Sequence, residues 1–173
     1  MILDNQQNII LIGFMGVGKG TIARALVKNS DFFAIDTDDL IESLENKKIK
    51  KIFEQEGEPH FRNLEKKCAL WCEKNLTNTI ISTGGGFYKQ DNLKKIGKVI
   101  YLQSTFDKIL EGIHNSPNSK KKLKKRPLLQ NIEEAKKIYN QRVTQYENVA
   151  DIIINIEDRD INQAVENILK AIK

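Results

Sequence analysis

The segment from Gly13 to Thr21 constrains this chain most, because it reads Gly-Phe-Met-Gly-Val-Gly-Lys-Gly-Thr. It follows an apolar run at 9–12 and precedes a stretch of helical pattern that begins at Ile22. Glycines let the backbone curl until several N–H groups point at one anion, and the N-terminus of the next helix adds positive charge. Lys19 can reach the outer phosphates. The segment therefore predicts a phosphate-binding loop for a nucleoside triphosphate, and the alternative is an ordinary glycine-rich turn.

One residue departs from the usual pattern of such loops. Gly20 follows the lysine, where a serine or threonine normally supplies a hydroxyl ligand for Mg²⁺. The ending Gly-Lys-Gly-Thr resembles that of adenylate kinases, in which it serves phosphoryl transfer. We therefore expect the ion to be bound by water or by Thr21. The nucleotide site itself is expected to consist of Gly16, Val17, Gly18, Lys19, Gly20 and Thr21.

Apolar runs rich in β-branched residues alternate with segments of helical period. This alternation predicts an α/β fold with three α/β/α layers, in which helices cover both faces of a five-stranded parallel sheet. The runs lie at 9–12, 32–35, 79–82, 99–102 and 152–156. Helices are expected at about 20–29, 37–46, 48–56, 61–75, 90–95, 105–114, 132–149 and 160–172. Residues 115–125 are polar and rich in lysine, so they predict a mobile surface loop.

The size and charge of the chain narrow the class of protein. A chain of 173 residues, 40% of them hydrophobic, fits a single domain, 1–173. No segment resembles a secretory signal or a membrane span, so a soluble cytoplasmic protein is expected. The net charge of +5 suits nucleic acid or any anionic substrate, and a solvated loop is the simplest account of the basic run at 120–126. Cys68 and Cys72 lie four residues apart without a nearby histidine, which indicates reduced packing residues and no metal site or disulfide.

Two carboxylates directly follow the second predicted strand. Asp36 and Asp38 alternate in extended chain and therefore face the same cleft as the phosphate loop. One carboxylate can bind Mg²⁺ while the other accepts a proton from a hydroxyl group. The alternative is that Thr37 or Asp38 merely caps the next helix. Carboxylates attract hydroxyl donors and repel phosphate, so an alcohol fits as phosphoryl acceptor better than a nucleotide does.

Two more segments complete the predicted acceptor side. Arg62 offers a rigid fork for a carboxylate, and Glu65 could hold it, although a surface ion pair is the alternative. His60 is interpreted as a structural loop residue. The consecutive glycines after the third strand let a ligand lie directly on the main chain, unless they form only a flexible turn. They are Gly84, Gly85 and Gly86, and Ser82 precedes them where phosphate-loop enzymes often place an acid near the metal.

These motifs, taken in order, resemble those of shikimate kinases. The set comprises the phosphate loop, Asp-Thr-Asp at 36–38, Phe-Arg-Asn-Leu-Glu at 61–65, the triple glycine, Arg-Pro-Leu-Leu at 126–129 and Arg142. The resemblance covers about residues 9–159. It implies transfer of the γ-phosphoryl group of ATP, with Mg²⁺, to the 3-hydroxyl of shikimate, in the pathway to chorismate and aromatic amino acids.

On the acceptor side, the resemblance implies a role for each matching residue. Asp38 contacts the shikimate hydroxyls and serves as the base, while Asp36 lies near Mg²⁺ and its waters. Arg62 and Arg142 clamp the shikimate carboxylate. The three glycines form the floor beneath the ring, and the acceptor-binding segment spans about 37–65.

On the nucleotide side, Lys19 and Arg126 flank the transferred phosphoryl group. Arg126 arrives on a lid of about 115–127, which has a row of lysines where the family often carries arginine and glycine. Arg159 matches a contact to adenine, and Ser82 matches the residue that replaces the metal-side acid. The position of the basic run beside Arg126 favours a phosphate lid over a nucleic-acid patch.

Two alternatives remain open at this point. The chain could be a related small-molecule kinase, for gluconate or for a nucleoside monophosphate, although paired acids argue against a nucleotide acceptor. It could also be a nucleotide-binding regulatory module that has lost its chemistry. The family resemblance favours a monomer, and we expect small-molecule partners only, with no nucleic acid and no membrane.

Overall fold

The computed structural model describes residues 7–117, 119–124, 127–157 and 160–172. Its centre is a five-stranded parallel sheet in the order β2-β3-β1-β4-β5. The strands are β1 (Asn8–Ile12), β2 (Phe33–Asp36), β3 (Thr79–Ser82), β4 (Gly97–Gln103) and β5 (Ile152–Asn155). The predicted sheet and its parallel direction are therefore confirmed, with each strand within one or two residues of its expected place.

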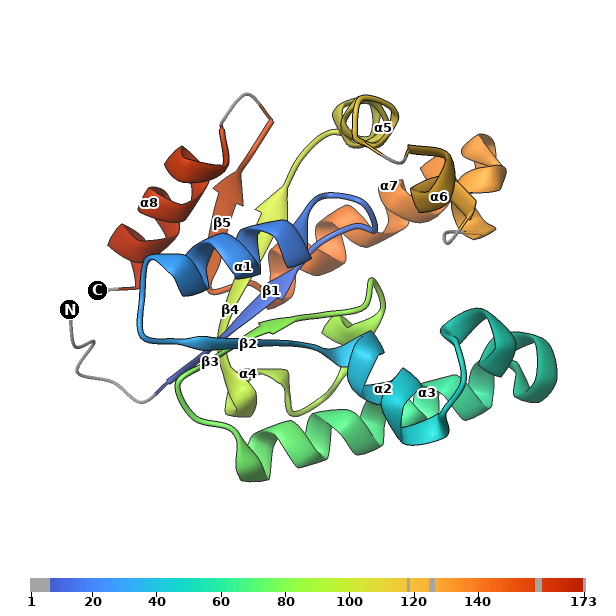
Figure 1. Ribbon diagram of the computed structural model, residues 1–173, viewed down its shortest axis with the longest axis horizontal. Coiled ribbons are helices and arrows are strands. Elements are labelled where there is room, and N and C mark those ends of the chain that lie inside the picture. Colours follow the sequence, from blue (N-terminus) through green and yellow to red (C-terminus); the bar gives the residue numbers. More distant parts are fainter. Residues whose placement is uncertain (1–6, 118, 125–126, 158–159, 173) are drawn as a thin grey trace.

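Helices cover both faces of this sheet (Figure 1). They are α1 (Lys19–Lys28), α2 (Thr37–Glu45), α3 (Ile49–Asn75), α4 (Leu93–Ile96), α5 (Phe106–His114), α6 (Ser119–Lys124), α7 (Ile132–Val149) and α8 (Ile161–Ala171). Short 3₁₀ turns lie at η1 (Phe87–Lys89) and η2 (Pro127–Gln130).

The alternation of side chains along β1 explains the two faces. Ile9 and Leu11 pack in one buried cluster with residues of α1 and α8. Ile10 and Ile12 point the other way, into a larger cluster with residues of α3, α4, α5 and α7. Because both faces of the strand are buried, its sequence reads as an unbroken apolar run.

Two local expectations differ from the structure, and both concern segments expected to be loops. The two helices expected at 48–56 and 61–75 are confirmed as the two segments of α3, which meet at a kink at Gly57, whose φ of 82° and ψ of 171° are not helical; the second segment begins earlier than expected. His60 consequently lies within α3 and not in a loop, and its Nε2 is 2.6 Å from Glu56 Oε2. The expected loop at 115–125 contains α6, since lysine is a good helix former and Leu123 packs against the core.

The connections place the predicted motifs at one edge of the sheet. The strands β2, β3 and β1 are neighbours, and Asp36 lies opposite Ser82 in the register. Because parallel strands end together, the phosphate loop after β1, the acids after β2 and the glycines after β3 share this edge. Figure 1 shows α7 approaching the same edge from the face opposite α1.

None of the helices in the described part of the chain is long and apolar enough to span a membrane.

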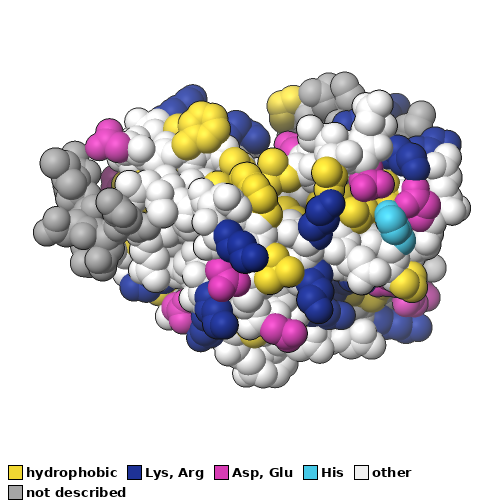
Figure 2. All heavy atoms as spheres, turned by 90° about the horizontal axis from the view of Figure 1, so that it is seen from below, with side chains coloured by type: hydrophobic (Ala, Val, Ile, Leu, Met, Phe, Trp, Pro, Cys, Tyr) yellow, Lys and Arg dark blue, Asp and Glu magenta, His cyan; other side chains and the backbone are white. Residues whose placement is uncertain are grey.

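Figure 2 shows the face formed by α2 and α3, where hydrophobic side chains lie among lysines, arginines and acids. Cys68 and Cys72 are free and buried in the core, which confirms their interpretation as packing residues.

Candidate active site

The loop between β1 and α1 is built on glycines and leads into the N-terminus of α1. Its glycines Gly16 and Gly18 have φ values of 85° and 107°, a region that residues with a side chain rarely adopt. Gly18 is the N-cap of α1 and has no side chain to satisfy the first turn of the helix. Lys19 Nζ donates to the carbonyl oxygens of Gly13 at 2.7 Å and Phe14 at 3.1 Å, so its ammonium group lies within the loop. Amides, helix N-terminus and ammonium together form a site for a phosphate chain.

The side chain of Asp36, at the end of β2, caps α2 and is hydrogen-bonded to Ser82 at the end of β3. Its Oδ1 accepts from the amide of Asp38 at 2.9 Å, and its Oδ2 accepts from Ser82 Oγ at 2.7 Å. The cap that the sequence assigned to Thr37 or Asp38 as an alternative is thus made by Asp36. Thr37 is buried instead and its hydroxyl accepts from the amide of Gly84 at 3.0 Å. These bonds fix the acids after β2 against the glycines after β3.

The capping role of Asp36 leaves Asp38 available for chemistry. Burial, assisted by the negative charges of Asp36 and Glu65, raises the pKa of Asp38 to about 7, while Lys19 opposes the shift. Its Oδ1 is buried and has no hydrogen-bond partner among the described residues. A buried oxygen without a partner is costly, so it marks a place where a ligand hydroxyl can bind. A pKa near neutrality also suits a group that exchanges a proton during a reaction.

Arg62 is held in α3 by two acids. Its Nη1 donates to Glu65 Oε2 at 2.6 Å, and its Nη2 donates to Glu58 Oε1 at 2.8 Å. Burial raises the pKa of Glu65, and the guanidinium of Arg62 opposes that shift. The pair with Glu65 confirms the contact expected from the sequence, but Glu65 is only 1% exposed, so this is no surface pair. The contact with Glu58 was not predicted, although its spacing of four residues on a helix could have indicated it.

Arg142 and Tyr146 reach the triple glycine from α7. Arg142 Nη1 donates to the carbonyl oxygen of Gly85 at 3.2 Å, and the hydroxyl of Tyr146 donates to the same oxygen at 2.7 Å. Tyr146 is buried and its ring stacks on Tyr101, with ring centroids 5.2 Å apart. Tyr146 was not predicted from the sequence. Its spacing of four residues after Arg142 on a helix was the available signal.

Each of the three glycines faces one charged side chain. A Cβ on Gly84 would lie 2.5 Å from Asp38 Oδ1, and one on Gly86 would lie 2.5 Å from Arg62 Nη1. A Cβ on Gly85 would lie 3.1 Å from Arg142 Nη1. We call residues 84–86 the glycine strip. It forms a backbone floor with a carboxylate at one end and two guanidinium groups over the other two glycines.

The predicted metal residues divide into two groups. Asp36 and Ser82 share a hydrogen bond at the edge of the sheet, and Gly20 faces them, since a Cβ there would lie 4.0 Å from Ser82 Oγ. Thr21 is exposed and its hydroxyl accepts from Arg24 Nη2 at 3.5 Å. Carboxylate and hydroxyl oxygens suit Mg²⁺, directly or through its waters, so the corner formed by Asp36 and Ser82 fits the ion.

Two predicted residues, Arg126 and Arg159, lie outside the described residues. The neighbouring elements of the predicted lid are described: α6 and η2 contact the core through Leu123, Leu128 and Leu129.

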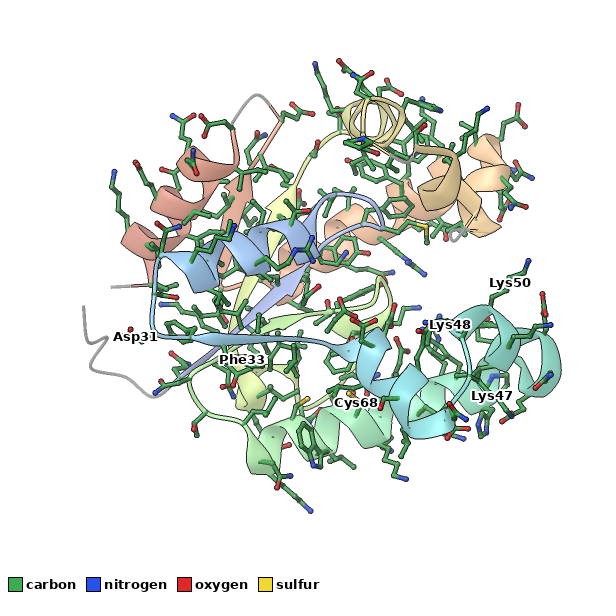
Figure 3. All side chains as sticks on the ribbon, viewed as in Figure 1. Asp31, Phe33, Lys47, Lys48, Lys50 and Cys68 are labelled. Carbon is green, nitrogen blue, oxygen red and sulfur yellow. The ribbon has the colours of Figure 1, made fainter. Side chains whose placement is uncertain are left out.

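Lys47, Lys48 and Lys50 lie around the connection of α2 and α3, away from the sheet edge (Figure 3). Lys48 Nζ pairs there with Glu42 Oε2 at 2.5 Å.

A separate cavity of about 220 Å³ lies between α2 and α3. Its lining is apolar apart from Lys67 and includes Cys68, which Figure 3 shows on α3 beneath α2. An acid that carries several hydroxyls needs polar partners, so this cavity does not suit the predicted acceptor. The glycine strip offers such partners.

Comparisons with known proteins agree on one family. Residues 15–173 match the family model described as shikimate kinase. A shikimate kinase of Helicobacter hepaticus is 38% identical over 149 residues, 86% of each chain. A shikimate kinase of Sulfurihydrogenibium is 38% identical over 96% of this chain and 98% of its own length.

Solved structures give the same result. Shikimate kinase from Acinetobacter baumannii in complex with shikimate superposes with a TM-score of 0.84 at 29% identity, over 96% of this chain and 92% of that chain. Shikimate kinase from Aquifex aeolicus gives a TM-score of 0.77 at 29% identity, over 95% of each chain.

Proposed function

The chain belongs to the shikimate kinase family, and we infer from this that it transfers the γ-phosphoryl group of ATP to the 3-hydroxyl of shikimate. The products are ADP and shikimate 3-phosphate, on the route to chorismate and the aromatic amino acids. The observation that supports this function most directly is the glycine strip. It pairs one carboxylate with two guanidinium groups over a side-chain-free floor, which matches a ring that carries hydroxyls at one end and a carboxylate at the other.

Asp38 is proposed as the group that receives the acceptor proton. Its unpartnered Oδ1 lies beside Gly84, where a ring hydroxyl can donate to it. Transfer of that proton increases the nucleophilicity of the hydroxyl oxygen as it attacks phosphorus. Arg62 and Arg142 are proposed to bind the acceptor carboxylate, so that charge at the far end of the ring orients the reacting hydroxyl.

The nucleotide is proposed to bind along Gly16, Val17, Gly18, Lys19, Gly20 and Thr21. Phosphoryl transfer needs positioning and compensation of charge on the phosphoryl oxygens more than covalent chemistry. The first-turn amides and Lys19 can supply this compensation. Arg126 is proposed to join them from the lid at 115–127, and Arg159 to contact the adenine. Closure of the lid would exclude water and so limit hydrolysis of ATP.

Mg²⁺ is the metal of the family, and when bound it would neutralise negative charge on the phosphate oxygens. Asp36 and Ser82 are proposed to hold it, directly or through water. The hydrogen bond between Asp36 and Ser82 fixes both oxygens at the sheet edge next to the phosphate loop.

One folded unit, 1–173, with an acceptor-binding segment at 37–65, is proposed to work as a monomer in the cytoplasm. Its free thiols, Cys68 and Cys72, suit a reducing compartment. Its partners are proposed to be small molecules only. Light scattering after gel filtration tests the monomeric state. A mass near 19.8 kDa supports a monomer, and twice that mass contradicts it.

A panel of acceptors tests the function. With ATP and Mg²⁺, shikimate should stimulate ADP release, while gluconate and nucleoside monophosphates should not. ADP release with gluconate alone would assign the chain to a different acceptor. Tight ATP binding without any turnover would indicate a regulatory module.

A further inference from the structure

Gly20 is not required by the backbone or by packing. It lies in the first turn of α1 and is not among the glycines with positive φ. A Cβ there would lie 3.4 Å from Arg24 Nη1 and 4.0 Å from Ser82 Oγ, which are ordinary contact distances. Within a helix, glycine costs about 1 kcal/mol relative to alanine. The position therefore accepts a side chain that this chain lacks.

A side chain at residue 20 would lie beside Arg24 and within contact distance of Ser82, one of the two residues of the metal corner, Asp36 and Ser82. The Cβ would lie 4.0 Å from Ser82 Oγ, which itself donates to Asp36 Oδ2 at 2.7 Å. A hydroxyl at residue 20 would thus join two oxygens that already suit Mg²⁺. Thr21 is the next residue with a hydroxyl, but its side chain is exposed and contacts Arg24. Successive helical residues point in directions about 100° apart, so Thr21 does not replace a side chain at residue 20.

We propose that this enzyme binds the Mg²⁺ of its nucleotide without a hydroxyl ligand from the phosphate loop, and that Gly20 thereby weakens its affinity for the ion. Water fills the position that a loop hydroxyl would take, and Asp36 and Ser82 orient that water. The nucleotide itself is held by the amides and Lys19, which need no metal. Nucleotide binding in this chain is therefore less dependent on Mg²⁺ than in a variant with a hydroxyl at residue 20. This inference rests on the proposed function, because it concerns the same nucleotide site.

A matched pair of variants tests the proposal. Gly20→Ser and Gly20→Ala both add a Cβ beside Arg24 and both favour the helix, but only serine adds a hydroxyl. Calorimetry measures the affinity for ADP at increasing concentrations of Mg²⁺. The readout is the Mg²⁺ concentration at which half of the total change in ADP affinity is reached. We expect Gly20→Ser to lower that concentration roughly tenfold, the size of effect that a metal-supporting group commonly has. Gly20→Ala should match the wild type.

Equal responses of the serine and alanine variants would overturn the inference. If serine is not tolerated, Gly20→Thr and Gly20→Val repeat the comparison with branched side chains of equal shape. Thr21→Val tests the alternative in the wild-type background: a roughly tenfold weaker response to Mg²⁺ would make Thr21 a ligand and contradict the proposal.

A second readout does not depend on affinity. With Mn²⁺ in place of Mg²⁺, broadening of the electron paramagnetic resonance by ¹⁷O-labelled water counts the waters on the metal in the ADP complex. The wild type should retain one water more than Gly20→Ser, and equal counts would contradict the inference. Failure of the wild type to bind ADP at any Mg²⁺ concentration would instead contradict the proposed function.

Discussion

At the scale of single residues, Asp38 shows most clearly how the fold produces a reactive group. It lies two residues from Asp36, yet the two carboxylates have different partners. Asp36 accepts from backbone amides and from Ser82, while Oδ1 of Asp38 is buried without a partner. Asp36 therefore holds the local structure together, while Asp38 has a pKa of about 7.

We expect Asp38→Asn to reduce turnover about 100- to 10,000-fold, the usual contribution of a positioned base. The amide keeps the shape of the side chain but cannot take a proton. A coupled assay of ADP release measures turnover, and calorimetry should give unchanged ADP affinity. Turnover within a few-fold of the wild type would remove Asp38 from the proposed chemistry.

Arg142 offers the cleaner test of the carboxylate clamp. Removing Arg62 would leave Glu65 buried without its partner, whereas the hydrogen bond of Arg142 is to the Gly85 carbonyl, which Tyr146 also satisfies. We expect Arg142→Met to weaken shikimate binding by roughly 2 to 3 kcal/mol through loss of a charge-assisted contact. Shikimate titrations followed by calorimetry measure this, and an unchanged affinity would exclude Arg142 from the clamp.

At the scale of elements, the glycine strip joins three parts of the fold. Asp38 comes from the start of α2, Arg62 from α3 and Arg142 from α7, and each meets one glycine. The strip therefore sets the spacing between the carboxylate and the two guanidinium groups.

Gly86→Ala tests this spacing. The new methyl would lie 2.5 Å from Arg62 Nη1 and displace it, so we expect KM for shikimate to rise roughly tenfold while KM for ATP stays unchanged. Gly112→Ala in α5 is the matched control, because a Cβ there meets nothing within 4 Å among the described residues. Equal effects of the two variants would show that the strip does not position Arg62.

The elements were predictable where a local pattern dictates them. The strand runs, the phosphate loop and helix α7 follow from apolar periodicity and glycine spacing. The break between the two segments of α3 was predictable as well, because Gly57 and Pro59 normally end a helix, but the helical conformation of His60 was not. Likewise the pairing of each glycine with one side chain, and the contribution of Tyr146, depend on packing between distant segments that no local pattern encodes.

At the scale of the whole molecule, the raised pKa of Asp38 makes folding depend on pH. Its folded pKa of about 7 exceeds its ordinary value of 3.8, so the folded state binds the proton more tightly. The wild type should therefore lose stability as pH rises from about 4 to about 7, and no further above that.

Asp38→Asn should remove this penalty. We expect its gain in unfolding free energy over the wild type, without ligands, to be larger at pH 8 than at pH 5 by about 2 kcal/mol. Urea denaturation at both pH values measures it. Asp31→Asn, at the opposite end of β2 (Figure 3), is the control and should change stability by less than about 0.5 kcal/mol at either pH. A gain for Asp38→Asn that is equal at pH 5 and pH 8 would contradict the burial of its charge.

The central claim is that the acceptor lies on the glycine strip between Asp38 and the two arginines. A crystal structure with shikimate and ADP tests it most directly. We predict a ring hydroxyl within hydrogen-bond distance of Asp38 Oδ1, with the shikimate carboxylate on Arg62 and Arg142. Shikimate bound elsewhere, or with its carboxylate turned toward Asp38, would contradict the account.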